Sequence, residues 1–218
     1  DVDTAPKVQA LANAVQAVMD GNATKAQLES LGVSGVTNNN LAAVQAALAA
    51  ATDATQLDTL THLQTVVTAA VDALDAIKQA AENNSATATS PSLTQYQTIG
   101  VVGVSAGNLA AINSALNDAD VQGANADTKS EVQAIVDGFK AILDNADNAA
   151  TTNPSQQNYI DIGVNGVDTA QEVTLLGDVI DGKASTDVDT VAKVQALANA
   201  VQAVMDGTAT KAQLESLG

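Results

Sequence analysis

Residues 1–32 read DVDTAPKVQALANAVQAVMDGNATKAQLESLG, and residues 187–218 read DVDTVAKVQALANAVQAVMDGTATKAQLESLG. The two stretches lie 186 residues apart (187 − 1). They differ only at Ala5/Val191, Pro6/Ala192 and Asn22/Thr208. Near-identity over such a length predicts an array of similar units that stack on their neighbours. We therefore expect the chain to be cut from a longer tandem array, with a structural role.

The repeated stretch carries the signals of two helices. Apolar residues recur at helical spacing at Val8, Leu11, Val15, Val18 and Met19, and Asp20-Gly21 provides a stop. Thr24-Lys25-Ala26-Gln27 then fits a capping box, in which the residue three after the threonine is Gln. A short helix should follow it and end at Gly32.

Two further helices are predicted after Gly32. The first is capped by Thr37 and has Leu41, Val44 and Leu48 on one side. The second begins after a break at residues 52–56, where Asp53 and Gln56 offer a cap, and runs to about Glu82. Its apolar stripe is Leu57, Leu60, Val67, Val71, Leu74 and Ile77. We expect side chains of this stripe, such as Val71, to lie in the core.

The same order of helices recurs twice more in diverged form. Residues 31–36 (LGVSGV) correspond to residues 99–104 (IGVVGV) and 162–167 (IGVNGV). The predicted units are 1–82, 83–148, 149–206 and the truncated start 207–218. Differences in length fall at residues 83–90, 117–127 and 149–154, where insertions into loops are tolerated.

No break separates the helix that closes one unit from the helix that opens the next. Residues 54–82, 127–148 and 187–206 are therefore interpreted as long helices shared by neighbouring units. The predicted fold class is all-α, with tandem three-helix bundles joined by shared long helices into an elongated rod.

Composition excludes several classes of function. The net charge of −17, with no Arg, argues against nucleic acid and against anionic membrane surfaces as partners. The absence of Cys excludes disulfides and thiolate chemistry. The only aromatic residues are Tyr96, Phe139 and Tyr159, which are too few for a usual small-molecule pocket.

The runs at residues 31–34 (LGVS) and 40–44 (NLAAV), followed by Thr52-Asp53 and a Leu/Val-striped helix, resemble the GA module. GA modules are three-helix domains of bacterial surface proteins, and some bind serum albumin. The whole acidic, Cys-free array also looks like the repetitive region of giant bacterial surface adhesins. That resemblance implies an extracellular location at the bacterial cell surface and a role as an extender.

Candidate chemistry is sparse. The sole histidine, His62, has no second His, Cys or Glu-x-x-His for a metal site. Gly100, Gly103 and Gly107 do not form a dinucleotide fingerprint, and Gly182-Lys183 lacks the rest of a P-loop. We interpret these glycines as helix C-caps and tight turns. No GxSxG motif or paired base supports a nucleophile.

Acidic residues leave one cofactor open. Asp1/Asp3, Asp187/Asp189 and the Asp144–Asp147 region present oxygen ligands without EF-hand spacing. Their simpler interpretation is as helix N-caps. No cofactor, catalytic residue or metal ligand is assigned, and weak calcium binding is kept as an alternative.

The leading hypothesis is a non-catalytic spacer of a bacterial surface adhesin, whose partners are neighbouring repeats of the same chain. The alternative is a GA-like binding module that grips a host or matrix protein through its helical faces. A third hypothesis is ice or mineral binding through Ala/Thr-rich faces. Thr lacks the 11-residue helical period that such a face would need.

Overall fold

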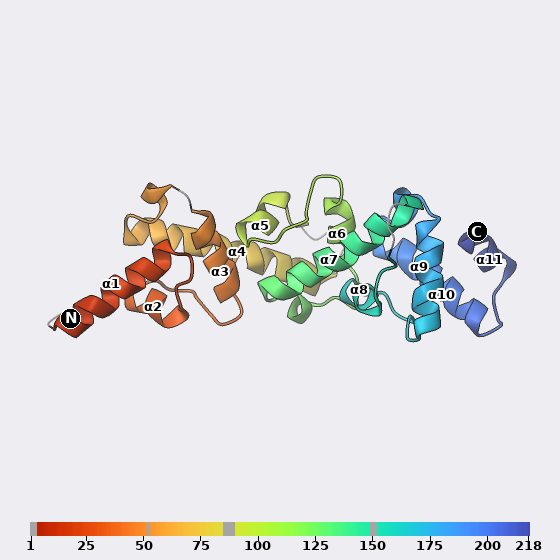
Figure 1. Ribbon diagram of the computed structural model, residues 1–218, viewed down its shortest axis with the longest axis horizontal. Coiled ribbons are helices and arrows are strands. Elements are labelled where there is room, and N and C mark those ends of the chain that lie inside the picture. The colour runs from red at the N-terminus through yellow and green to blue at the C-terminus, as the bar shows by residue number, and fades with distance from the viewer. Residues whose placement is uncertain (1–3, 52, 85–89, 149–151) are drawn as a thin grey trace.

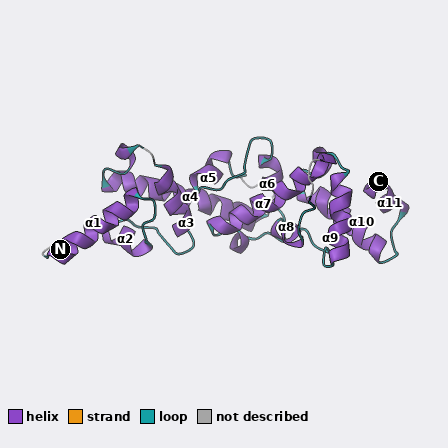
Figure 2. Ribbon diagram, in the orientation of Figure 1, coloured by secondary structure: helices purple, strands orange, loops and turns teal. Residues whose placement is uncertain are grey.

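The chain folds entirely into helices and connecting loops. The computed structural model describes residues 4–51, 53–84, 90–148 and 152–218, and in these residues there is no strand (Figure 2). The α helices are α1 (Ala5–Met19), α2 (Lys25–Ser30), α3 (Leu41–Ala50), α4 (Leu60–Asn83), α5 (Leu93–Thr98), α6 (Leu109–Leu116), α7 (Lys129–Asn145), α8 (Gln156–Asp161), α9 (Ala170–Asp181), α10 (Val191–Met205) and α11 (Lys211–Leu217). The all-α prediction is confirmed.

The helices succeed one another along the long axis of the molecule. The two termini lie at opposite ends of the view in Figure 1. Helix α4 packs on α3 and on α5, α7 packs on α6 and α8, and α10 packs on α9 and α11. Each of these longer helices thus contacts both the helix before it and the helix after it in sequence. Within the described residues, none of the helices has the length and apolar character needed to cross a bilayer.

Helix α4 contributes to two hydrophobic cores. Leu63 and Val67, in its first half, pack in a core with Val18, Leu28 and Val44 of the helices that precede α4. Its second half belongs to another core, which extends to α10; its α4 members are Ala73, Leu74, Ile77, Ala80 and Ala81. The two cores are therefore joined by one helix of 24 residues without a break.

The long helices begin at a threonine. The hydroxyl groups of Thr59, Thr128 and Thr190 accept hydrogen bonds from backbone N–H groups three residues later. Short 3₁₀ turns precede them: η1 (Ala54–Gln56), η2 (Gly123–Asn125) and η4 (Ser185–Asp187). The predicted starts at residues 54 and 187 were therefore too early. A further 3₁₀ turn, η3 (Ala146–Asn148), follows α7.

Two predicted caps are corrected. The cap before α10 is Thr190 and not an aspartate; Asp189 instead pairs with the Lys193 ammonium at 2.6 Å. Helix α3 begins after Asn40. Thr37 and Asn40 exchange hydrogen bonds, because the Thr37 N–H donates to Asn40 Oδ1 at 2.7 Å and the Asn40 N–H donates to Thr37 Oγ1 at 3.2 Å.

The short helices have the predicted start and end. The capping box of Thr24 and Gln27 is present in α2, and equivalent boxes begin α5, α8 and α11. Gly32, Gly100 and Gly163 follow α2, α5 and α8 and have φ values of 89°, 70° and 88°. In each case the next N–H donates to the carbonyl five residues back, which is the Schellman arrangement that favours glycine.

Part of the predicted core is exposed. Val8, Val15 and Met19 of α1 are about half exposed, because no described segment packs on that side of the helix. Leu60 is also about half exposed, and Val71 is partly buried and packs against the core that contains Val67. The prediction for Val71 is therefore confirmed only in part, whereas Val67 and Leu74 are buried as expected.

The predicted unit boundaries stay predictions. Those after residues 82 and 206 lie next to the ends of α4 and α10. The boundary after residue 148 falls beside residues 149–151, which lie outside the described residues. The insertion at residues 83–90 also lies largely outside them.

Two buried tyrosines occupy the position that Leu28 holds in α2. Tyr96 of α5 donates a hydrogen bond from its hydroxyl to Asn113 Oδ1 at 2.8 Å. Tyr159 of α8 is equally buried, but its hydroxyl has no hydrogen-bond partner among the described residues. The difference arises on the facing helix. Asn108 and Glu172 are equivalent, because each accepts a hydrogen bond from the N–H three residues earlier. Five residues after them, α6 has Asn113, whereas α9 has Gly177. Burial raises the pKa of both phenols.

We expect Tyr96→Phe and Tyr159→Phe to have unequal effects on stability. The first removes a buried hydrogen bond and leaves Asn113 short of a donor, which should destabilise the protein by about 1–2 kcal/mol. The second removes a buried hydroxyl that has no hydrogen-bond partner in the described part of the chain, so stability should be unchanged or slightly higher. Urea denaturation followed by circular dichroism measures both. Equal losses would contradict the assigned hydrogen bonds.

Candidate functional site: a repeated glutamine clamp

A glutamine recurs at one position of each long helix. It lies five residues after the threonine cap, in the pattern Asp-Thr-x-x-x-x-Gln. The three instances are 58–64 (DTLTHLQ), 127–133 (DTKSEVQ) and 189–195 (DTVAKVQ). The cap sets where the helix begins, so the glutamine is placed on the same helical face each time.

Each glutamine binds both backbone groups of one loop residue. The Ser34 N–H donates to Gln64 Oε1 at 2.9 Å, and Gln64 Nε2 donates to the Ser34 carbonyl at 3.2 Å. Gln133 makes the same pair with Val102 at 2.9 and 3.0 Å. Gln195 makes it with Asn165 at 2.8 and 3.0 Å. We call this arrangement the glutamine clamp.

The clamp joins the start of a long helix to the exit of a short one. Ser34, Val102 and Asn165 each lie two residues after a Schellman glycine. The clamped residue precedes its glutamine by 30 or 31 positions in the chain. A loop that leaves its short helix is thus fixed, through two hydrogen bonds, to the helix that begins the next part of the chain.

A fourth copy of the pattern binds no loop among the residues that the structure describes. Residues 3–9 read DTAPKVQ, and Gln9 lies five residues after Thr4, as the others do. Within the described residues, Gln9 Nε2 donates to Asn13 Oδ1 at 2.8 Å, one turn along α1, and to no loop. The equivalent bond in α10, from Gln195 Nε2 to Asn199 Oδ1, is also 2.8 Å long. The two glutamines therefore have the same helical neighbour and differ in the loop.

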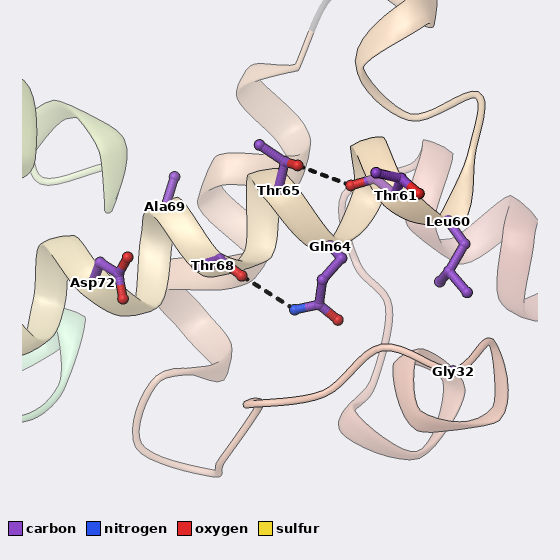
Figure 3. A pocket seen from close by; sticks show the side chains of 8 residues that line it. All are labelled: Gly32, Leu60, Thr61, Gln64, Thr65, Thr68, Ala69 and Asp72. Carbon is purple, nitrogen blue, oxygen red and sulfur yellow. Dashed lines mark hydrogen bonds between the residues drawn. The ribbon is translucent and has the colours of Figure 1, made fainter.

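An open groove of about 620 Å³ lies beside the first clamp. Its walls are Gly32 and one face of α4 from Leu60 to Asp72, including Gln64 (Figure 3). Thr61, Thr65 and Thr68 give it hydroxyl groups, but Thr65 donates to the Thr61 carbonyl and Thr68 accepts from Gln64.

The three threonines of the groove do not recur in the other long helices. The residues at the equivalent positions of α7 are Ser130, Ala134 and Asp137. In α10 they are Ala192, Ala196 and Asn199. The threonine face therefore belongs to α4 alone among the three long helices. This argues against ice or mineral binding by a repeated face.

His62 lies on the exposed side of α4 and pairs with an aspartate. Its Nδ1 is 2.6 Å from Asp58 Oδ1, one turn earlier. This hydrogen bond raises the pKa of His62 above its usual value. In the part of the chain that the structure describes, His62 does not belong to any group of three metal-ligating side chains.

The predicted acidic ligands have other partners. Asp144 pairs with Lys140, and Asp189 pairs with Lys193. Asp147 has a left-handed backbone (φ 64°), and its carboxylate accepts a hydrogen bond from the Ser185 N–H. Asp1 and Asp3 lie outside the described residues. Over residues 4–51, 53–84, 90–148 and 152–218, no three acidic or histidine side chains come together as a cation site.

The predicted turn and C-cap glycines are confirmed. Gly100 and Gly103 have positive φ in the loop after α5, Gly107 lies in the turn before α6, and Gly182 is the C-cap residue of α9. Two glycines inside helices allow close packing instead. A Cβ on Gly138 would lie 2.7 Å from the Asn158 carbonyl oxygen, and one on Gly177 would lie 2.4 Å from Asn153 Cγ.

Sequence reasoning missed the clamp. Its signal is the fourfold recurrence of Asp-Thr followed by Gln five residues after the threonine, at residues 3–9, 58–64, 127–133 and 189–195. The glutamine partners are backbone groups, so the residues they bind differ in type (Ser34, Val102 and Asn165) and leave no pattern of their own.

No family model matches the chain, and the searches of curated proteins and of solved structures found no similar protein. The resemblances to GA modules and to adhesin repeats therefore stay predictions.

The clamp predicts different effects for one substitution at two equivalent sites. Gln195→Ala removes both hydrogen bonds to Asn165, so we expect a loss of about 1–2 kcal/mol and faster hydrogen exchange at the Asn165 amide. Gln9→Ala removes only a surface contact with Asn13 and should change stability by less than about 0.5 kcal/mol. Hydrogen exchange followed by mass spectrometry measures both. Equal effects would rule out the clamp as the cause.

Proposed function

We propose that this chain is a non-catalytic spacer, built from tandem three-helix units that share long helices and together form a rod. Its task is to hold a binding domain of a bacterial surface adhesin away from the cell. The observation that carries the proposal is α4, which supplies one half to each of two cores without an intervening linker.

Physical arguments support a mechanical role. A continuous helix transmits the orientation of one core to the next, whereas a Gly/Ser linker would leave the cores free to turn. The glutamine clamps add a second connection at each repeat. The net charge of −17 makes neighbouring molecules repel one another and so opposes side-by-side association.

Small-angle X-ray scattering tests the proposal. A compact chain of this length has a radius of gyration of about 17 Å. We expect a clearly larger value and the pair-distance distribution of an elongated particle. A matched variant carries Gly-Ser-Gly-Ser between Val71 and Asp72, where α4 passes from one core to the other. It should keep its helical circular dichroism but scatter as a flexible particle. A radius near 17 Å for the unmodified chain would refute the spacer.

The alternative function is a binding module for a host or matrix protein. Exposed apolar side chains that recur on the short and middle helices would favour it. Ile160 is exposed on α8, but its equivalents beside Leu28 and Tyr96 are Glu29 and Gln97. Among the described residues, no exposed apolar face repeats on these helices. A pulldown from serum with this chain discriminates the two, since specific retention of a serum protein would favour the binding module.

A further inference from the structure

The two copies of the repeated sequence differ in which residues they expose. In α1, Val8 and Val15 are 53% and 50% exposed. Their equivalents in α10, Val194 and Val201, are fully buried. The sequences are the same over residues 7–21 and 193–207, so the difference comes from what packs on the helix. Helices α9 and α6 cover α10, and no described segment covers this side of α1.

The segments that pack on α10 make both hydrogen bonds and apolar contacts with it. The clamp binds Gln195 to Asn165, which lies in the loop before α9. The Val191 N–H donates to the Ser114 hydroxyl of α6 at 3.1 Å. Leu197 and Ala198 belong to the same core as Leu176 and Ile180 of α9. This face of α10 is thus in contact with the loop before α9, with α6 and with α9.

In the second helix of the repeat, the buried residue is in the first copy and the exposed one is in the second copy. Leu28 of α2 is fully buried, whereas its equivalent Leu214 of α11 is 51% exposed. In the first copy, Gln45 of α3 donates to the Ala23 carbonyl at 3.1 Å, and Val44 and Leu48 of α3 lie in the core with Leu28. Each end of the molecule therefore presents the face that the other end has covered.

We infer that the face of α1 formed by Gln9, Val8, Leu11 and Val15 is the docking surface for a second, tandem copy of this chain. The α9 helix of that copy lies on α1 as it lies on α10 within one chain, and Gln9 clamps the backbone of its Asn165. The inference deepens the proposed function and depends on it only for the tandem arrangement of the copies.

The residues that differ between the two ends are compatible with this docking. Pro6 lies in the first turn of α1, where its missing N–H is not needed for a helical hydrogen bond. Ala5 replaces the buried Val191 by a smaller apolar side chain, which fits the same space with less contact. Asn22 and Thr208 lie in the loops after α1 and α10, beyond the docking face.

A free second molecule is a poorer occupant than a tandem one. The α9 face of every molecule is already covered by its own α10, so a separate copy has to displace that helix before it can bind α1. A copy joined through its residue 186 to Asp1 meets no such competitor, because α1 itself then stands in the position of α10.

Thiol accessibility tests the inference, since the chain contains no cysteine. The protein is a concatemer of residues 1–186 followed by residues 1–218. Two single-cysteine versions carry Val15→Cys, one in the first copy and one in the second. We expect the first-copy thiol to react freely with a thiol reagent and the second-copy thiol to react at least about tenfold more slowly. In the second copy, Gln9→Ala should speed hydrogen exchange at Asn165 of the first.

The outcomes separate the inference from the proposed function. Equal reaction rates for the two thiols would overturn the docking surface, even if scattering showed an extended particle. A protected second-copy thiol in a compact particle would support the docking surface and refute the spacer. Circular dichroism of both versions confirms that the substitutions leave the helices folded.

Discussion

Val201→Asp is expected to unfold the C-terminal part of the molecule, whereas Val15→Asp leaves it folded. Val201 is fully buried in the core between α9 and α10. A carboxylate there has no partner for its charge and should destabilise the core by about 3–5 kcal/mol. Val15 has the same neighbours in sequence, but it is half exposed, so the same change should alter stability by less than about 0.5 kcal/mol.

The two variants are matched controls for each other. Each replaces a valine in the sequence NAVQAVM and adds one negative charge, so helix propensity and net charge change equally. Helical circular dichroism during thermal melting measures the difference. Several cores need not melt as one unit, so the expected result is an early transition of part of the helical signal in Val201→Asp. Similar melting curves for both variants would contradict the packing of α10 on α9.

Leu28→Ala is expected to be strongly destabilising and Leu214→Ala nearly neutral. Leu28 is fully enclosed by α1, α3 and α4, and a large-to-small change in such a place costs about 2–5 kcal/mol, because a cavity remains. Leu214 stands in the same sequence, KAQLESLG, with about half of its surface in water. Its truncation should cost less than about 1 kcal/mol.

Urea denaturation of the two leucine variants measures this difference. In this pair the buried residue is in the first copy of the repeat, and in the valine pair it is in the second. The two pairs together test whether burial, rather than position near a chain end, sets the effect of a substitution. If the residue nearer the C-terminus were always the more sensitive, the assigned packing would be wrong.

Local structure followed closely from the sequence. The capping box at Thr24 and Gln27 was predicted correctly, as were the glycine exits at Gly32, Gly100 and Gly163. These features depend on hydrogen bonds within a few residues and on the conformational freedom of glycine, so their signals are local. The starts of the long helices were less accurate, since a 3₁₀ turn and a threonine cap compete with the apolar stripe that suggested an earlier start.

The burial of particular residues did not follow from the sequence. Val8 and Val194 have the same neighbours in the chain and opposite exposure. The same holds for Gln9 and Gln195, of which only the second binds a loop. An apolar stripe shows which face of a helix can be buried, but the partner that buries it lies elsewhere in the chain.

For this protein the sequence by itself determined the all-helical class, the repeat and the capping boxes and glycine exits of the short helices, because these depend on interactions over short distances along the chain. Only the tertiary structure decided that Gln64, Gln133 and Gln195 bind loops about 30 residues earlier, and that equivalent residues of two nearly identical stretches differ in burial. These features depend on contacts between distant segments, and two nearly identical sequences cannot encode different neighbours.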